Sequence, residues 1–362
     1  MNLVLALLGV LLILMILWDA FETIILPRRV TRRLRLTTLF YRSIWWPWSG
    51  LALRLTSGRK REKYLGLFGP LSLILLLVVW AGGVIFGYAL IAWSLDEKLR
   101  TADIVNFWTY LYLSGTNFFT LGYGDVTPIE PIGRAFAVVE AGTGFAMLAI
   151  VIGYLPVLYQ AFSRREVNIS LLDQRAGSPS SPAELLRRHK ASGSGADLDE
   201  FLGEWERWAA ELMESHLSYP VLCYFRSQHD NQSWLAALTT ILDTCALVIV
   251  GIGGSPAWQA RLTFAMARHA IVDLAQVFRT TPTTHHASKS RLSHADFQRL
   301  LSIVRPEQGD LTDVEHKLMQ MREMYEPYVA ALSEFLVMPL PPWILSEATI
   351  DNWKTSAWGR IQ

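Results

Sequence analysis

Two glycines flank a tyrosine in the stretch Thr120–Asp125, which reads TLGYGD and lies between two long apolar runs. Glycine tolerates positive backbone φ angles that side chains disfavour, so successive carbonyl groups here can turn toward one axis. Carbonyl oxygens aligned in this way replace the water shell of a cation, and the Thr120 hydroxyl adds a further ligand. One chain supplies one wall of such a site, so the pattern predicts four chains around a pore. The predicted cation ligands are Thr120, Leu121, Gly122, Tyr123 and Gly124.

The segments on either side of this stretch are long enough to hold it inside a membrane. Residues 67–95 and 132–162 form apolar runs that exceed the roughly 20 residues needed to cross a bilayer. Between them, Asn106–Phe119 is apolar but too short to cross, which predicts a helix that enters the membrane halfway. The negative end of its dipole would favour a cation at the glycine loop. A surface helix followed by a glycine turn would explain the glycines, but not their position between two spanning runs.

Glu140 is an ionisable residue within the second apolar run, where an unpaired charge is costly. We expect its side chain to bond the back of the half-crossing helix near Ser114 or Thr116 and to stiffen the glycine loop. Asp125, at the end of the loop, is expected to support it as well. The alternative for Glu140 is a protonated side chain packed against another helix.

Two positions in the same run are candidates for a bend. Gly144, close to Gly142, lacks side-chain bulk, and Pro156 removes one hydrogen bond from the helix ladder. Either would serve as the hinge of a gate, while glycines in spanning helices also serve as close-packing sites. In the earlier run, glycines that would let a neighbouring helix approach closely are Gly82, Gly83 and Gly87.

The first 66 residues predict the membrane topology. Residues 1–26 are apolar up to Asp19 and Glu22, which indicates a transmembrane helix with its N-terminus outside; a helix lying in the interface is the alternative. Residues 27–66 are strongly basic, so this linker should stay on the cytoplasmic side of the plasma membrane and contact lipid headgroups. Its arginines cluster outside the apolar runs, which argues against a voltage sensor. The expected partners of the two carboxylates are Arg28, Arg29 and Arg32.

Composition divides the chain into a membrane part and a soluble part. Of its 362 residues, 51% are hydrophobic and 18% are charged, and the net charge of +1 gives no reason to expect nucleic acid. Cys223 and Cys245 lack C-x-x-C spacing, which predicts reduced thiols. The sequence contains no phosphate loop, catalytic triad or zinc-spaced cysteine set. We therefore expect neither an enzyme nor a cofactor beyond the permeant ion.

The stretch TLGYGD resembles the signature of potassium channels, whose common form is TVGYGD. Gly133-Arg134 is similar to the pair that opens the inner helix of that family, and Gly144 falls on its hinge glycine. The chain departs from the family at Thr116, where many members carry a carboxylate, and at Tyr112-Leu113, where many carry two tryptophans. The resemblance spans residues 67–162. It implies a homotetramer whose filter binds K⁺ at Thr120, Leu121, Gly122 and Tyr123.

The chain beyond the third run predicts a soluble, helical region. A linker is expected at residues 163–196, followed by an all-helical cytoplasmic regulatory domain at residues 197–362. With residues 67–162 as the pore module and an extra N-terminal transmembrane helix, the predicted fold class is all-α. A helical domain attached to a pore could bind a small-molecule or protein regulator, and the sequence names neither.

Two further motifs in this region have weaker chemical readings. Gly251–Pro256 is glycine-rich, but a dinucleotide fingerprint requires glycine where Pro256 stands, which favours a turn between helices. A histidine-containing loop could bind a metal, although its Thr/Ser-rich surroundings favour plain flexibility. The residues of that candidate metal site are His285, His286, His294 and Asp296.

Two functions remain after these comparisons of patterns. The first is a potassium-selective channel subunit that conducts passively and is gated or modulated by the cytoplasmic domain, as a ligand-gated or leak channel. The alternative is a membrane receptor or scaffold whose pore module does not conduct. A side chain at Gly122 or Gly124 would obstruct the required backbone, so the intact glycines favour conduction. The sequence shows no internal repeat or nucleotide motif that would indicate a coupled transporter.

Overall fold

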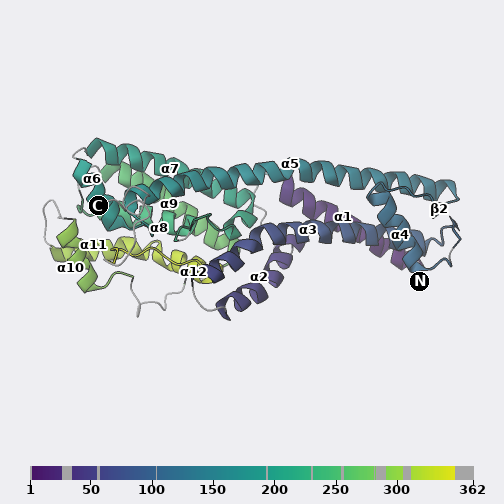
Figure 1. Cartoon of the computed structure of the whole chain (residues 1–362), viewed down its shortest axis with the longest axis horizontal. Coiled ribbons are helices and arrows are strands. Elements are labelled where there is room, and N and C mark those ends of the chain that lie inside the picture. The colour runs from purple at the N-terminus through teal and green to yellow at the C-terminus, as the bar shows by residue number, and fades with distance from the viewer. Residues whose placement is uncertain are drawn as a thin grey trace, which may run out of the picture. The chain divides into compact units, whose positions relative to one another are not determined.

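The computed structural model describes residues 2–26, 35–54, 58–102, 104–192, 195–229, 231–253, 257–280, 282, 291–304 and 311–346. These residues are helical almost throughout, and their strands are the short antiparallel pair β1 (Leu99–Arg100) and β2 (Thr127–Pro128). Three of the described helices, α1, α3 and α5, are long and apolar enough to cross a membrane (Figure 1). The expected all-α membrane fold with an additional N-terminal helix is confirmed.

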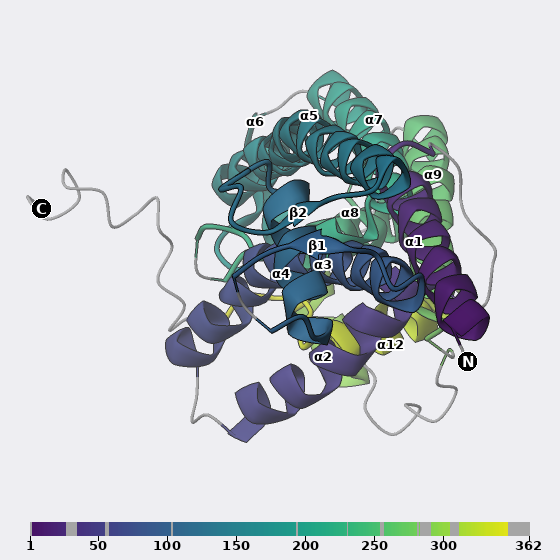
Figure 2. The same cartoon turned by 90° about the vertical axis from the view of Figure 1, so that its right-hand side faces the viewer.

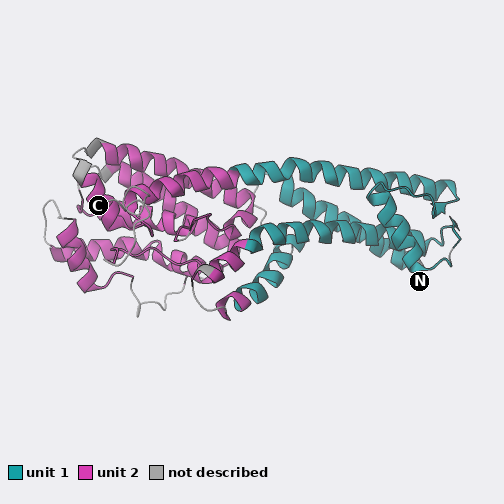
Figure 3. Cartoon of the chain, viewed as in Figure 1, with its two compact units in different colours: residues 1–50, 67–160 teal, residues 51–66, 161–362 magenta. Residues whose placement is uncertain are grey.

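Residue contacts divide the chain into two compact units (Figure 3). They are unit 1, residues 1–50 and 67–160, and unit 2, residues 51–66 and 161–362. Helices α3 (Arg59–Ser94) and α5 (Pro131–Ala176) each contribute residues to both units. The unit boundary at residues 66 and 67 coincides with the start of the expected pore module, and the boundary at residues 160 and 161 lies two residues before its expected end.

The segment expected to be a linker, residues 163–196, is largely helical in the described part. α5 continues past the charged pair Arg164-Arg165 to Ala176, and α6 (Pro182–Ser192) follows. Charged residues that are good helix formers end an apolar run without ending a helix. In the short connection, Ser181 is fully buried. This part of the chain packs into unit 2 instead of forming a flexible spacer.

In unit 1, α1 (Asn2–Ile24) packs closely against α3. A Cβ atom at Gly83 would overlap Ile16, and one at Gly87 would overlap Ile13. Residue numbers rise along α1 as they fall along α3, so the two helices are antiparallel. The expected close approach of a neighbouring helix is confirmed at Gly83 and Gly87, whereas Gly82 faces open space.

Two buried carboxylates near the end of α1 connect three helices of unit 1. Asp19 accepts hydrogen bonds from Trp80 Nε1 of α3 (3.0 Å) and from the backbone amide of Thr37 (3.2 Å), in the first turn of α2 (Leu36–Arg54). Glu22 Oε2 lies 3.5 Å from Arg35 Nε. The partners expected from the sequence lie outside the described residues; they are Arg28, Arg29 and Arg32.

The core of unit 2 is built around α8 (Trp234–Ile249). Every residue of α8 from Trp234 to Val248 is buried, so the expected core helix is confirmed. α7 (Gly195–Ser218) and α9 (Ala257–Phe278) pack together, and Thr263 of α9 donates its hydroxyl to the Leu202 carbonyl of α7 (2.8 Å). The remaining elements are η1 (Pro220–Tyr224), α10 (His294–Ile303), α11 (Leu311–Glu323) and α12 (Glu326–Leu336).

The weaker motifs of this region have plain structural roles where they are described. Gly251 and Gly253 adopt positive φ angles of 88° and 101° in the turn that follows α8. His294 Nδ1 lies 2.9 Å from Glu315 Oε1, and the described residues contain no group of three metal-ligating side chains. The other two histidines of the candidate metal site, His285 and His286, lie outside the described residues.

Candidate cation-binding site

The short helix α4 (Phe107–Phe118) begins at a well-formed cap. Asn106 Oδ1 accepts hydrogen bonds from the amides of Trp108 (2.9 Å) and Thr109 (3.3 Å). The Thr109 hydroxyl accepts in turn from the Asn106 amide (3.2 Å), which completes a reciprocal capping box. The start of α4 is therefore fixed by its own sequence.

The end of α4 runs directly into the TLGYGD stretch. The amides of Phe119, Thr120 and Leu121 donate to carbonyls of the last turn of α4, at 3.1, 2.9 and 2.8 Å. These bonds satisfy helix carbonyls that would otherwise lack partners. The first residues of the stretch are thus held by the helix, whose negative dipole end lies at this junction. The accepting carbonyls belong to Gly115, Asn117 and Thr116, respectively.

The backbone of the stretch alternates in handedness. Thr120, Gly122 and Gly124 have positive φ angles of 54°, 56° and 78°, whereas Leu121 and Tyr123 do not. Alternation of this kind reverses the usual flip between neighbouring peptide planes, so successive carbonyls can share one side of the chain. Glycine takes these angles without strain, but at Thr120 a left-handed conformation costs about 1–2 kcal/mol. The amide of this strained threonine and those of its two neighbours, Phe119 and Leu121, donate to carbonyls of α4.

The front of the stretch is open within one chain. Leu121 is 53% exposed and Tyr123 is 69% exposed, although both are large hydrophobic residues. A Cβ atom at Gly122 or Gly124 would meet no atom within 4 Å. A single chain can therefore present carbonyl oxygens to a cation from one side only.

The outer end of the stretch is fastened by Asp125. Its Oδ2 atom accepts a hydrogen bond from the Tyr112 hydroxyl of α4 (2.7 Å), and its Oδ1 atom accepts from the Val126 amide (3.0 Å). In the sequence, Tyr112 stands out only as a departure from the family pattern. The signal that could have identified this pair is a tyrosine hydroxyl on the helix that precedes the TLGYGD stretch, together with the acidic residue that ends the stretch.

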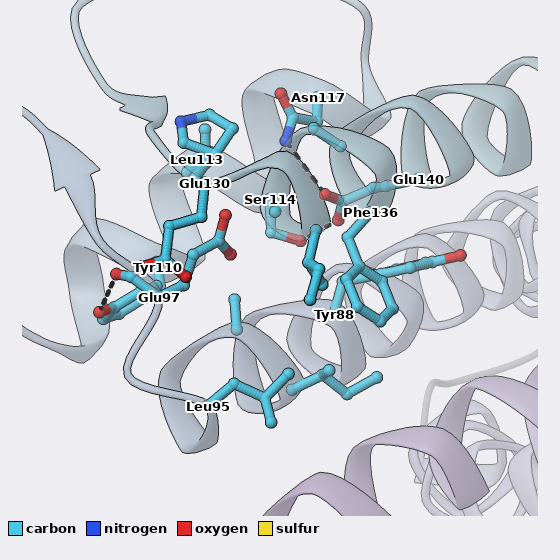
Figure 4. A pocket seen from close by; sticks show the side chains of 16 residues that line it. Tyr88, Leu95, Glu97, Tyr110, Leu113, Ser114, Asn117, Glu130, Phe136 and Glu140 are labelled. Atoms are coloured by element: carbon cyan, nitrogen blue, oxygen red, sulfur yellow. Dashed lines mark hydrogen bonds between the residues drawn. The ribbon is translucent and has the colours of Figure 1, made fainter.

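Behind α4, Glu140 of α5 reaches the helix at two positions (Figure 4). Glu140 is 4% exposed, and its carboxylate accepts from the Ser114 hydroxyl and from Asn117 Nδ2 (3.2 Å). The structure thus contains the expected contact with Ser114. Thr116 instead donates its hydroxyl to the Leu113 carbonyl within α4 (2.8 Å).

Asn117 is a second partner of Glu140 that was not predicted from the sequence. It lies three residues after Ser114, which places both side chains on one face of α4. The same residue also accepts the Thr120 amide through its carbonyl. Glu140 therefore acts on a residue that itself holds the first part of the glycine loop. Whether this contact stiffens the loop stays a prediction.

A cavity of about 210 Å³ lies between α3, α4 and α5 beside this contact (Figure 4). Its outer wall includes Glu97, whose backbone carbonyl accepts from the Tyr110 hydroxyl (2.8 Å), and Glu130. Burial raises the pKa of Glu97, and the neighbouring charge of Glu130 raises it further. The cavity is thus polar at its outer end and apolar along α3.

The candidate hinge positions Gly144 and Pro156, and Gly142 close to the first of them, differ in their surroundings. A Cβ atom at Gly144 would overlap the Phe118 carbonyl at the end of α4, whereas one at Gly142 would meet nothing within 4 Å. Gly144 therefore allows α5 to approach the backbone just before the glycine loop. Pro156 is exposed, and α5 is helical through both positions. The hinge role of Gly144 and Pro156 stays a prediction.

Comparisons with known proteins agree with a membrane channel. Residues 73–160 match the family model described as "Ion channel". The chain is 24% identical over 210 residues to the uncharacterized membrane protein YdjJ of Bacillus subtilis, which covers 57% of this chain and 60% of that protein. It is 33% identical over 87 residues to Protein LctB of Geobacillus stearothermophilus, with 21% and 64% covered.

A second LctB protein, from Bacillus caldotenax, is 50% identical over 42 residues, with 12% of this chain and 31% of that protein covered. The chain spans less than two thirds of the length of each of these relatives. No solved structure matches the chain. The family match and the apolar helices support an ion channel in a membrane.

Proposed function

We propose that the chain is one subunit of a homotetrameric, potassium-selective channel in which residues 120–124 form the ion-binding filter. The observation that carries this proposal is the alternating backbone of the TLGYGD stretch, held at one end by α4 and at the other by Asp125. Four such walls would surround a K⁺ ion with carbonyl oxygens that replace its hydration shell. K⁺ is the permeant ion here, and the filter atoms that bind it are backbone carbonyls and the Thr120 hydroxyl.

The exposed surface of α5 supports assembly of several copies. Four large residues at intervals of seven are 63–73% exposed. Residues at this spacing lie on one face of a helix. Such a face would line or surround a pore when copies of α5 meet, and Gly144 of α5 lies against Phe118, just before the exposed filter. The four residues are Val138, Phe145, Ile152 and Tyr159.

The antiparallel packing of α1 on α3 supports a topology with three crossings. If residues 27–66 stay cytoplasmic, α1 runs inward, α3 outward and α5 inward. The N-terminus then lies outside and the C-terminal region lies in the cytoplasm of the cell whose plasma membrane holds the protein. The loop that carries the filter enters from the outer side.

Within unit 2, the extension of α5 carries a buried arginine. Arg165 is 3% exposed and donates to the carbonyls of Leu222 and Phe225, both at 2.9 Å. It also contacts His216 Nε2 (3.1 Å) and Glu166 (2.9 Å). Burial and the neighbouring Arg165 hold the pKa of His216 well below its usual range. The neutral imidazole can therefore accept a hydrogen bond from the guanidinium.

The same segment of unit 2 also contacts the start of α3. Arg226 lies 3.5 Å from Glu62 of α3 and donates to the Val337 carbonyl (3.1 Å) that follows α12. Burial lowers the pKa of Arg226 to about 10. We name residues 222–227, with Arg165 and Glu62, the helix junction. The helix junction includes residues from the start of α3 and from the extension of α5. It therefore offers a route by which a regulator of the cytoplasmic domain would gate the pore.

Potassium efflux from liposomes tests the proposal. Purified chain in potassium-loaded liposomes should release K⁺, and Gly122→Asp should reduce release to the level of empty liposomes because φ at residue 122 is +56°. Gly142→Ala, at a position with open space in a regular helix, is the matched control and should conduct. Equal flux in wild type and Gly122→Asp would favour a receptor or scaffold with a non-conducting pore.

A further inference from the structure

The helix α2 has two faces of different character. On one face, Tyr41, Trp45 and Trp48 pack edge-to-face around Phe68 of α3, with ring centroids 6.5, 4.7 and 5.7 Å away. Such aromatic contacts contribute about 0.5–1.5 kcal/mol each beyond the area they bury. The aromatic face of α2 therefore fixes this helix to the N-terminal part of α3.

The opposite face of α2 is apolar but exposed. Leu39 is 65% exposed, Trp46 81% and Leu53 60%, and the interval of seven residues places them on one side of the helix. Two basic residues on the same side, Arg42 and Arg54, are exposed as well. The sequence of α2 contains no acidic residue. We name these five residues the outer face of α2.

The position of α2 along α3 agrees with the edge of a bilayer. The last charged residue at the start of α3 is Lys63, and Phe68 lies five positions further into the apolar run. At the helical rise this is about 7.5 Å. Interfacial helices bury their apolar side roughly 5–10 Å into the boundary between headgroups and acyl chains. In two perpendicular views α2 diverges from α3 instead of running alongside it (Figure 1, Figure 2).

We propose that the outer face of α2 lies in the inner leaflet of the membrane and binds anionic lipid headgroups. Trp46 and the two leucines enter the apolar boundary, while Arg42 and Arg54 contact phosphate groups at its edge. The occupant follows from the chain itself, because α2 connects two helices that are each long enough to span a bilayer. The inference rests on the proposed topology, in which residues 27–66 are cytoplasmic, but it does not depend on conduction.

The proposal can be tested with a fluorophore that reports its surroundings. Trp46→Cys in the full chain is labelled with the environment-sensitive dye NBD and reconstituted in phosphatidylglycerol-containing liposomes. The two native cysteines are buried, and unsubstituted chain measures any labelling at them. Trp258→Cys is the matched control, because Trp258 is also exposed, at 70%, but lies on α9 of unit 2. Leu39→Cys repeats the measurement at a second position of the outer face.

Lipids that carry a nitroxide near the headgroup should quench NBD at residues 46 and 39 at least about twofold more than at residue 258. Aqueous iodide should quench in the reverse order. Strong iodide quenching at residue 46, equal to that at 258, would overturn the proposal. Shielding from both quenchers would also overturn it, because a second copy of the chain would then cover this face.

The basic residues are tested in the same labelled background. Replacement of phosphatidylglycerol by phosphatidylcholine should reduce lipid quenching at residue 46, and Arg42→Gln with Arg54→Gln should remove this dependence on headgroup charge. Quenching that is indifferent to headgroup charge in the unsubstituted helix would contradict the anionic preference. Potassium efflux measured from the same liposomes separates this result from a failure of the channel proposal.

Discussion

The TLGYGD stretch and the helix junction satisfy their polar groups in opposite ways. In the stretch, Leu121 and Tyr123 are exposed and the open side has no covering element within the described part of the chain. At the junction, Arg165 is 3% exposed and surrounded by acceptors of its own unit. The first site is incomplete in one chain, whereas the second is complete.

This difference separates what each region contributes. A backbone site that is finished by other chains should tolerate substitution without loss of the fold, while conduction is lost. Removal of a buried guanidinium whose partners are all in the same unit should first reduce the stability of that unit, because buried acceptors are left without donors. Measurements of stability and of flux should therefore respond to different residues.

Arg165→Met should give the largest loss of stability. The substitution keeps much of the side-chain volume but removes donors to the carbonyls of Leu222 and Phe225 and leaves Glu166 without its charged partner. We expect unit 2 to lose about 3–5 kcal/mol, the range for breaking a buried ion pair. Hydrogen exchange of peptides covering residues 216–226 would measure it.

The neighbouring Arg164→Met is the matched control, since Arg164 is exposed on the same helix turn. It should change protection in those peptides by less than about 0.5 kcal/mol. Similar losses in both variants would contradict a complete, side-chain-specific junction.

Gly144→Ala tests the contact between α5 and the end of α4. A methyl group there overlaps the Phe118 carbonyl, and overpacking of this kind costs about 1–3 kcal/mol. We expect lower flux with unit 2 unchanged, because the displaced backbone leads into Thr120. Gly142→Ala should behave like wild type in the same efflux measurement. Normal flux in Gly144→Ala would show that this close approach does not position the loop.

Tyr112→Phe removes the hydroxyl that holds Asp125 at the outer end of the loop. Its hydrogen bond to the carboxylate spans 2.7 Å at an exposed position, so we expect its loss to affect the loop more than the stability of the fold. The expected phenotype is faster decline of current under sustained conduction in planar bilayers, with little change in protein stability. Tyr88→Phe, which loses a contact with Thr143 of α5, serves as the comparison. Equal decline in both variants would argue against a specific role for Tyr112.

His216 should make unit 2 sensitive to acid. Its pKa is depressed in the folded chain, so below about pH 6.5 the unfolded chain takes up a proton that the folded chain does not. Stability should fall with decreasing pH by at most about 1.4 kcal/mol per pH unit from this group. His216→Gln should flatten the slope between pH 6.5 and 5 in thermal unfolding of the detergent-solubilised chain. An unchanged slope would assign the acid sensitivity to other groups.

The sequence predicted the parts of the site that depend on local pattern. The positive φ angles at the two glycines, the short helix α4 before them and the burial of α8 all follow from residues that are close in the chain. The contact of Glu140 with Ser114 was also accessible, because a carboxylate in a spanning helix needs a polar partner. The choice between Ser114, Asn117 and Thr116 was not, since it depends on the rotation of α4.

Long-range features escaped the sequence analysis for physical reasons. Arg165 lies just past the apolar run of residues 132–162, and its partners lie about 50–60 residues further on, where no local pattern indicates them. Residues 163–196 were predicted to form a linker, although residues 163–176 continue α5. The positive φ of Thr120 is likewise set by the capping of α4 and not by residue type.

Ion selectivity can be measured as the reversal potential of the purified chain in a planar bilayer with K⁺ on one side and Na⁺ on the other. A filter of carbonyl oxygens selective for K⁺ should shift this potential by more than about 59 mV, which corresponds to a tenfold preference. The shift should be lost, together with the current, in Gly122→Asp. A current with a reversal potential near zero, or an equal current in Gly122→Asp, would contradict the assignment of residues 120–124 as a potassium filter.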